Sequence, residues 1–169
     1  MRQASDPPDV PVKHALRTIP PGLHFVSTPI GAARDITLRA LDVLAGADVL
    51  VAEDTRTLRH LMEIHGIALA GRPLIAYHDH SGEGPLQRLL GLIAEGKSLA
   101  YASEAGTPLI SDPGFELARA VAAAGLPIFL DLKLHDIPNT VAEGMRSLMR
   151  LSPSPVLINL HASGGMAMM

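Results

Sequence analysis

The chain has 169 residues, 47% of them hydrophobic, which is enough for one compact domain with a buried core and too few for two complete ones. It contains no cysteine, which excludes a disulfide framework, a thiolate zinc site and a cysteine nucleophile. It has neither an apolar run of membrane-spanning length nor a secretory leader, so we expect a cytoplasmic protein without a membrane partner. The net charge of −3 gives no general attraction to RNA, so any RNA contact has to be a local patch.

Residues 1–22 are rich in proline and show no sustained apolar period, so we predict a flexible leader. From Leu23 onward, short apolar runs alternate with stretches of helical periodicity. The predicted strands are 23–28, 48–53, 73–78, 98–103, 127–131 and 155–160. The predicted helices are 36–44, 55–65, 85–95, 114–124 and 138–151, with stop signals at Gly46, Gly66, Gly96 and Gly125.

This alternation predicts an α/β fold, a three-layer sandwich whose mostly parallel sheet has about six strands and is covered on both faces. Ligands of such sheets bind at the loops that leave the carboxyl ends of the strands. Three of these loops have unusual residues. One is a Thr-Pro-Ile-Gly turn at 28–31, one is the Glu-Asp-Thr-Arg run at 53–56, and one is a long loop of small residues at 103–114. Taken singly, the first loop is explained equally well as an ordinary turn, and the second is better explained as a helix cap.

Together the strings HFVSTPIGAARDITLRALDVLAGADVLVAEDTRTLRHLMEIHGI, PLIAYHDH and GKSLAYASEAGTPLISDPGFELARA resemble the small-subunit rRNA cytidine 2′-O-methyltransferases. These are S-adenosylmethionine enzymes of the tetrapyrrole-methylase-like class, and the resemblance covers about residues 23–125. Two positions depart from the family pattern, Ala32 in place of Asn and Glu104 in place of Asp. The resemblance implies small-subunit rRNA as partner.

The same resemblance implies a site for S-adenosylmethionine whose amino-terminal wall is formed by the loops named above. The implied cofactor-binding residues are Pro29, Gly31, Asp54, Ser103, Glu104, Gly106, Thr107 and Pro108. A carboxylate there could hold ribose hydroxyls or stabilise the sulfonium, and a base could deprotonate the attacking hydroxyl. Asp54 and Glu104 are both candidates for that base. We expect the second domain of that family, and its Pro-Gly-Pro-Ser-type segment, to be absent.

Residues 126–169 resemble a different family. The string DLKLHDIPNT at 131–140, followed by NLHASGG at 159–165, resembles an internal piece of orotidine 5′-phosphate decarboxylase, a (β/α)8 barrel. The resemblance implies that Asp131 repels the substrate carboxylate, that Lys133 protonates the carbanion, and that Asp136 supports the array across a homodimer interface. Thr140 would lie at the substrate. Other members of the array and most of the barrel are not present, so we expect these last strands to pack into the sheet of the first part instead.

Two further signals are weaker. His78 and His80 could share one face of a strand as metal ligands, but no third ligand is evident and we predict no metal. Arg56, Arg59 and His60 could touch RNA phosphates, although nearby acids favour a solvated mixed-charge face.

Three functional hypotheses remain open. The chain is a methyltransferase part that holds S-adenosylmethionine, a decarboxylase fragment, or a non-catalytic fusion that binds neither ligand. Family origin favours the methyltransferase, and for turnover the sequence favours none of the three.

Overall fold

The computed structural model describes residues 18–78, 81–106, 108–109, 113–131, 137–152 and 166. Five strands lie in this part of the chain: β1 (Gly22–Val26), β2 (Val49–Ala52), β3 (Leu74–Ala76), β4 (Ser98–Ala102) and β5 (Ile128–Asp131). They alternate with five helices: α1 (Leu38–Gly46), α2 (Thr55–Ile64), α3 (Glu83–Ala94), α4 (Gly114–Ala123) and α5 (Pro138–Leu148). The predicted sixth strand, 155–160, lies outside the described residues.

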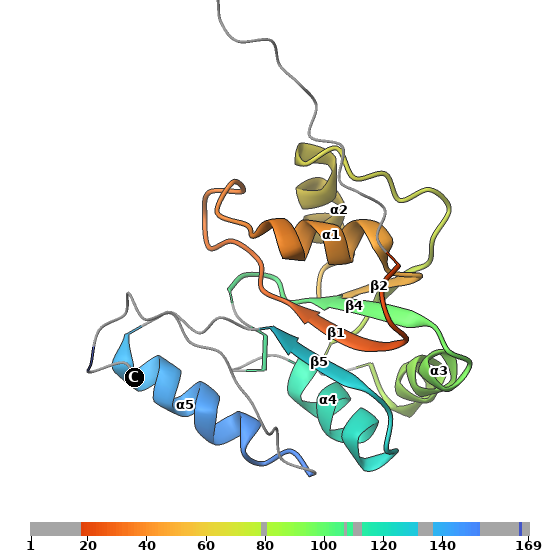
Figure 1. The fold of residues 1–169 in the computed structure, drawn as a ribbon, viewed down its shortest axis with the longest axis vertical. Coiled ribbons are helices and arrows are strands. Elements are labelled where there is room, and N and C mark those ends of the chain that lie inside the picture. The colour runs from red at the N-terminus through yellow and green to blue at the C-terminus, as the bar shows by residue number, and fades with distance from the viewer. Residues whose placement is uncertain are drawn as a thin grey trace, which may run out of the picture.

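The five strands form one sheet in the order β3-β2-β4-β1-β5, and all four pairings are parallel. Helices α1 and α2 lie on one side of this sheet, and α3, α4 and α5 lie on the other (Figure 1). The predicted three-layer α/β sandwich is therefore confirmed.

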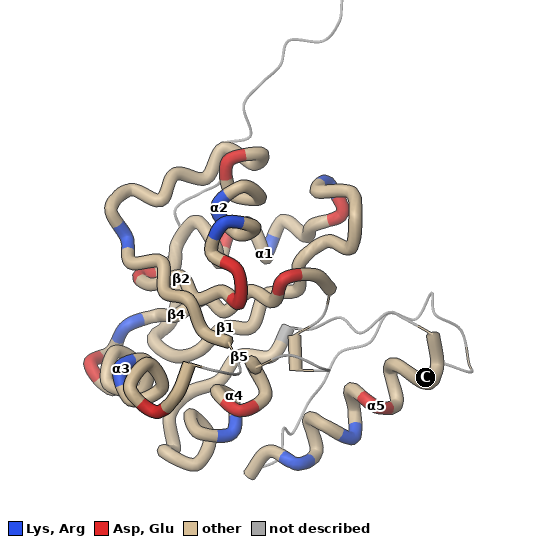
Figure 2. Tube along the Cα trace, turned by 180° about the vertical axis from the view of Figure 1, so that it is seen from behind, with Lys and Arg blue, Asp and Glu red and all other residues tan. Residues whose placement is uncertain are grey.

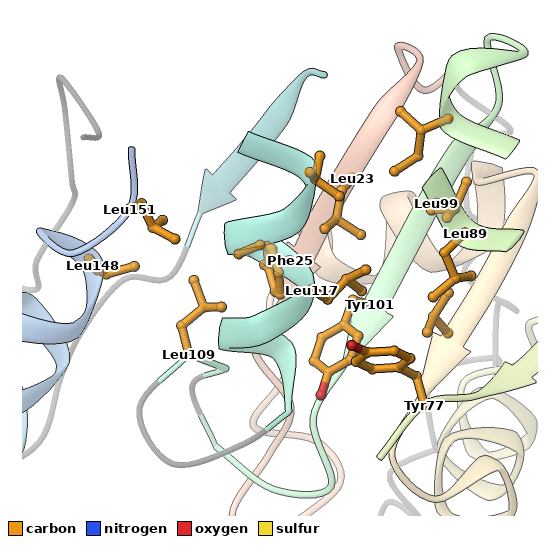
Figure 3. Packing of buried hydrophobic residues seen from close by; sticks show 14 of the residues in the cluster. Leu23, Phe25, Tyr77, Leu89, Leu99, Tyr101, Leu109, Leu117, Leu148 and Leu151 are labelled. Atoms are coloured by element: carbon orange, nitrogen blue, oxygen red, sulfur yellow. The ribbon is translucent and has the colours of Figure 1, made fainter. Parts of the chain in front are cut away.

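Side-chain alternation along the strands explains the two covered faces. Phe25, Val51 and Tyr101 belong to the core under α3, α4 and α5 (Figure 3). The next residues along each strand, Val26, Ala52 and Ala102, belong to the second core, under α1 and α2. Because every central strand is apolar on both faces, burial favours a sheet with helices on each side over a two-layer arrangement.

Local signals fix where the helices begin and end. The Thr37 hydroxyl accepts a hydrogen bond from the backbone N–H of Ala40 at 3.1 Å, so α1 begins at Leu38 and not at the predicted residue 36. Gly66, Gly96 and Gly125 follow α2, α3 and α4 with positive φ angles of 67°, 81° and 68°, as their role as stop signals predicts.

Strand β5 brings the carboxyl-terminal part of the chain into the sheet. It pairs with β1 from Leu23↔Ile128 to Val26↔Asp131, and the backbone N–H of Leu23 donates to the Pro127 carbonyl at 3.0 Å. Helix α5 adds buried Val141 and Leu148 to the same core as α4. Residues from both sides of position 126 therefore share one sheet and one core.

Candidate functional site

The strands of the sheet end along one line. Val26 pairs with Ala102 on one side and with Asp131 on the other, and Ala102 pairs in turn with Ala52. The loops that follow β1, β2 and β4 therefore leave the same edge of the sheet. These are the loops in which the sequence places the cofactor-binding residues.

The connections at this edge part in two directions. The loops after β1 and β2 lead to α1 and α2 on one face, whereas the loop after β4 leads to α4 on the other face (Figure 1). Since β4 lies between β1 and β2, the loops diverge on both sides of it. Such a switch in direction is where open α/β sheets bind their ligands.

The loops that follow β1 and β4 are joined by backbone hydrogen bonds. Thr28 and Gly106 form an antiparallel bridge in which each N–H donates to the other's carbonyl at 3.0 Å. The Thr28 hydroxyl donates to the Ser103 carbonyl at 3.1 Å, and the Ser103 hydroxyl donates to the Gly106 carbonyl at 3.2 Å. Thr28 and Ser103 are buried. The two loops therefore form a single preformed unit.

Glycine is required where these loops meet. Gly106 has a φ of +86°, and a Cβ atom there would lie 3.2 Å from Cδ1 of Ile30. Gly31 has a φ of +96°, and a Cβ atom there would meet nothing within 4 Å. Around them Pro29 is half-buried, Pro108 is buried, and the Ile30 side chain is 73% exposed. Backbone thus lies open at Gly31, where a ligand can approach closely.

Both carboxylate oxygens of Asp54 accept hydrogen bonds. Its Oδ1 accepts from the Arg56 backbone N–H at 2.7 Å and from Arg56 Nε at 3.3 Å, while Oδ2 accepts from Arg56 Nη2 at 2.9 Å. These bonds cap α2 and lower the pKa of Asp54 to about 2, chiefly through the side-chain hydrogen bonds from Arg56. Asp54 is therefore a permanent anion and a weak base at neutral pH.

Glu104 is the other carboxylate at this edge. It is exposed, and it follows directly on Ser103, whose hydroxyl and carbonyl both take part in the bridged loops. Its backbone is thus held while its side chain faces solvent. Thr107, also expected at the cofactor, lies outside the described residues.

The residues of the decarboxylase resemblance are only partly described. Asp131 ends β5 beside Val26, at the same edge as the three loops, although its side chain lies outside the description. Thr140 is half-buried in the first turn of α5. Lys133 and Asp136 lie outside the described residues, so the array as a whole stays a prediction.

Two positioning contacts have no signal in the sequence. One is the Thr28 hydroxyl bond described above. The other is His65, at the end of α2, whose Nε2 donates to the Ala33 carbonyl at 2.8 Å and so fastens the first loop at its far side. A contact across 32 residues depends on the packing of α2 against that loop, which residue types alone do not predict.

Metal ligands and membrane spans were also considered. Within the described ranges, which stop short of His80, no three His, Cys, Asp or Glu side chains are grouped as a metal site would need. None of the helices in the part of the chain that the structure covers is both long and apolar enough to cross a membrane.

Charge is mixed over the helices. Basic and acidic residues both occur on α3, α4 and α5 (Figure 2), and some of them form exposed pairs such as Glu143–Arg146 at 2.7 Å. The described surface of these helices therefore offers no extended face of one sign to a nucleic acid.

Comparison with known proteins finds two families. The sequence model of the orotidine 5′-phosphate decarboxylase / HUMPS family matches residues 40–169. The ribosomal RNA small subunit methyltransferase I of Mesorhizobium japonicum is 43% identical over 66% of this chain and 37% of its own length. The protein of the same name from Xylella fastidiosa is 46% identical over 64% of this chain and 39% of its own length. The chain thus spans less than two fifths of the length of these relatives.

A solved structure of a uroporphyrin-III C-methyltransferase from Thermus thermophilus is 29% identical, with a TM-score of 0.49, over 64% of this chain and 46% of that chain. The chain is thus similar to ribosomal RNA methyltransferases over about two thirds of its length, and it also matches the decarboxylase family model over residues 40–169.

The order of the strands shows which fold is adopted by the described residues that the decarboxylase family model matches. In a (β/α)8 barrel each strand pairs with the next along the chain. Here β2 pairs with β4, and β1 lies between β4 and β5. The region from residue 40 to β5 is therefore an open sheet and not a section of a barrel.

Proposed function

This chain belongs to the orotidine 5′-phosphate decarboxylase / HUMPS family through its match over residues 40–169, and we propose that its working site is nevertheless a methyl-donor site, which binds S-adenosylmethionine at the carboxyl ends of β1, β2 and β4. The observation that carries this proposal is the bridge between Thr28 and Gly106, which joins two of the three expected ligand loops into one unit. A preformed site of this kind binds with little ordering cost.

Each loop has a distinct part in the proposed site. The open backbone at Gly31 and the buried Pro108 form the surface against which the donor lies. The hydrogen bond from the Ser103 hydroxyl to the Gly106 carbonyl holds the loop after β4 in place. Glu104 offers a carboxylate to the ribose hydroxyls or to the positive charge of the sulfonium.

Asp54 and Glu104 have different roles in the proposed site. Because Asp54 is engaged by Arg56 and has a pKa of about 2, it takes a proton from a hydroxyl poorly. We therefore assign to Asp54 the capping of α2 and the holding of Arg56. Glu104 remains as the carboxylate that touches the ligand.

The acceptor and the assembly follow from the resemblances. We propose small-subunit rRNA as the methyl acceptor, because the relatives that share 43% and 46% identity with this chain are named as ribosomal RNA small subunit methyltransferases. A homodimer, which the decarboxylase resemblance implies, stays a prediction to be checked by light scattering.

A decarboxylase site is the second candidate. In its favour, Asp131 and Thr140 belong to β5 and α5, which pack into the same fold as the methyltransferase-like loops. Against it, an open sheet does not provide the ring of strand ends on which that array is built. We place this activity second for that reason.

Isothermal titration with S-adenosylhomocysteine, with uridine monophosphate as the parallel ligand, tests the proposal. Saturable binding of the first ligand alone supports it. Binding of uridine monophosphate alone would favour the decarboxylase site, and no heat from either ligand would leave a fold without a ligand site.

A matched pair of glycine variants locates the binding. Gly106→Ala and Gly96→Ala both place a Cβ at positive φ, at 86° and 81°, so each should cost about 1 kcal/mol of stability. Only Gly106 lies in the proposed site. We expect Gly106→Ala to weaken S-adenosylhomocysteine binding at least roughly tenfold, the equivalent of one 1.4 kcal/mol step, and Gly96→Ala to leave it unchanged. Equal affinities would place the ligand elsewhere.

A further inference from the structure

Leu109 has an unusual backbone conformation for its residue type. Its φ angle is +74°, and among the described residues only Ala70, at +52°, also has a positive φ without being glycine. In this left-handed region the Cβ atom of an L residue lies too close to the following carbonyl oxygen, so a leucine adopts it only where its surroundings impose it. Leu109 belongs to the loop after β4, one of the three loops of the proposed site.

Burial of the Leu109 side chain explains why this conformation persists. The residue is 1% exposed and belongs to the hydrophobic core that also contains Leu117 of α4 and Leu148 of α5. Figure 3 shows the side chain pointing from the loop toward these two helices. Burying a leucine stabilises a protein by more than one left-handed residue costs, so the core holds Leu109 in place. Ala70, by contrast, is exposed.

The place of Leu109 in the loop gives this anchor a consequence. Three residues earlier, Gly106 is held by its two backbone hydrogen bonds to Thr28, both of 3.0 Å. Pro108 lies between the two fixed points, is buried, and has a φ angle that its ring restricts. The segment that carries Gly106 and Pro108 is therefore held at one end by the bridge and at the other by the core.

We infer that Leu109 is a positioning residue for the methyl-donor site: its side chain, anchored in the core, holds Gly106 and Pro108 where the ligand meets them. This inference rests on the proposed function. The alternative is that Leu109 only forms a turn. The two roles differ in what glycine does, because glycine adopts a positive φ without strain but has no side chain to reach the core.

Leu109→Gly tests the inference by two measurements. The first is amide hydrogen exchange without ligand, read as the rate at Gly106 relative to that at Leu50, whose N–H donates to the Pro73 carbonyl at 2.9 Å. We expect this ratio to rise at least roughly tenfold, because the loop then opens locally. The second is titration with S-adenosylhomocysteine, where we expect roughly tenfold weaker binding. A turn residue would give unchanged or slower exchange.

Two further variants at this position complete the series. Leu109→Met keeps nearly the same buried volume, so it should restore the exchange ratio and most of the affinity. Leu109→Ala loses the anchor but keeps a Cβ atom at positive φ, so it should loosen the loop as the glycine variant does. Where either truncated variant is too unstable, both measurements are made in sucrose, which favours the folded state.

Ala70→Gly and Leu89→Ala are the matched controls. Ala70→Gly makes the same backbone change in an exposed turn, and it should alter neither the exchange ratio nor the affinity. Leu89 of α3 is fully buried in the same core as Leu109. Leu89→Ala should lower the melting temperature, but it should leave the affinity unchanged at a temperature where the variant is folded.

The possible outcomes separate the two proposals. An unmodified protein that does not bind S-adenosylhomocysteine overturns the proposed function, and this inference with it. Binding by the unmodified protein, combined with an unchanged exchange ratio and affinity in Leu109→Gly, overturns the inference alone. The inference also fails if Leu89→Ala weakens binding as much as Leu109→Gly does, because a general loss of stability would then explain both effects.

Discussion

Arg72 shows how a single side chain joins its own loop to a segment that is separate in the sequence, the end of α1. Its guanidinium donates to four carbonyls, those of Leu44 at 2.8 Å, Ala47 at 2.9 Å, Ala68 at 2.9 Å and Leu69 at 3.1 Å. Two of these carbonyls belong to the end of α1, whose last carbonyls have no partner within the helix. Burial lowers the pKa of Arg72, although it stays charged at any physiological pH.

We predict that Arg72→Ala lowers the free energy of unfolding by about 2 kcal/mol, because it leaves partly buried carbonyls without donors. Arg72→Lys should recover less than half of this loss, since an ammonium group lacks the forked donors. Urea unfolding measures both. Arg88→Ala on the exposed side of α3 serves as control and should stay within about 0.5 kcal/mol of the unmodified protein.

At this scale the sequence predicts candidate residues at the strand ends, but not which of them are already bonded to a neighbour. Glu104 and Asp54 look alike as acids at strand ends, and only the three bonds from Arg56 show that Asp54 is occupied. Thr28 and His65 escape prediction because their partners, Ser103 and Ala33, are remote along the chain. Their roles depend on tertiary packing.

At the scale of elements, prediction succeeds where local signals agree. The five described strands and five helices overlap their predicted ranges, and Gly125 ends α4 as a stop residue, whereas α1 begins later than predicted because Thr37 caps it. The strand order is different. Nothing local says that β4 comes between β1 and β2, because this depends on long crossovers and on the two separate cores. Prediction therefore stops at the class of fold.

The β1–β5 pair contains a titratable contact between the two parts of the chain. His24 of β1 stacks on Phe129 of β5, with ring centroids 4.2 Å apart and planes 3° from parallel, and its Nε2 donates to the Pro20 carbonyl at 2.8 Å. Burial lowers the pKa of His24 below 6.5, and the Pro20 bond opposes this only in part. The neutral ring is thus the form that the folded state favours.

The sign of the pH effect follows from that shift. Because the folded pKa is below the unfolded value, the unfolded state binds the proton first, and stability falls as the pH drops below about 6.5. We predict that His24→Phe, which keeps an aromatic ring against Phe129, flattens the melting temperature between pH 7 and pH 5. His60→Phe, on the exposed side of α2, should leave the slope as it is. An unchanged slope in His24→Phe would mean that other groups set it.

At the scale of the whole molecule, the residues before and after position 126 share one sheet. The predicted join lies between the end of α4 and the start of β5, and β5 takes the place beside β1 in the sheet. Helix α5 then covers the core that α4 and β1 already share. If burial drives this arrangement, the residues before and after position 126 should unfold together in one transition.

Two leucines test this cooperativity. Leu117 of α4 and Leu148 of α5 are almost fully buried in the same core (Figure 3). We predict that Leu117→Ala and Leu148→Ala each lower the free energy of unfolding by about 3 kcal/mol in a single transition, because each leaves a cavity in shared packing. Exposed Met149, next to Leu148, is the control, and Met149→Ala should change little. Denaturant unfolding followed by circular dichroism gives both the midpoint and the number of transitions. A Leu148→Ala variant that keeps the main midpoint, or that adds a second and weaker transition, would show α5 to be an appendage, and the contribution of the second part to the fold would then end at β5.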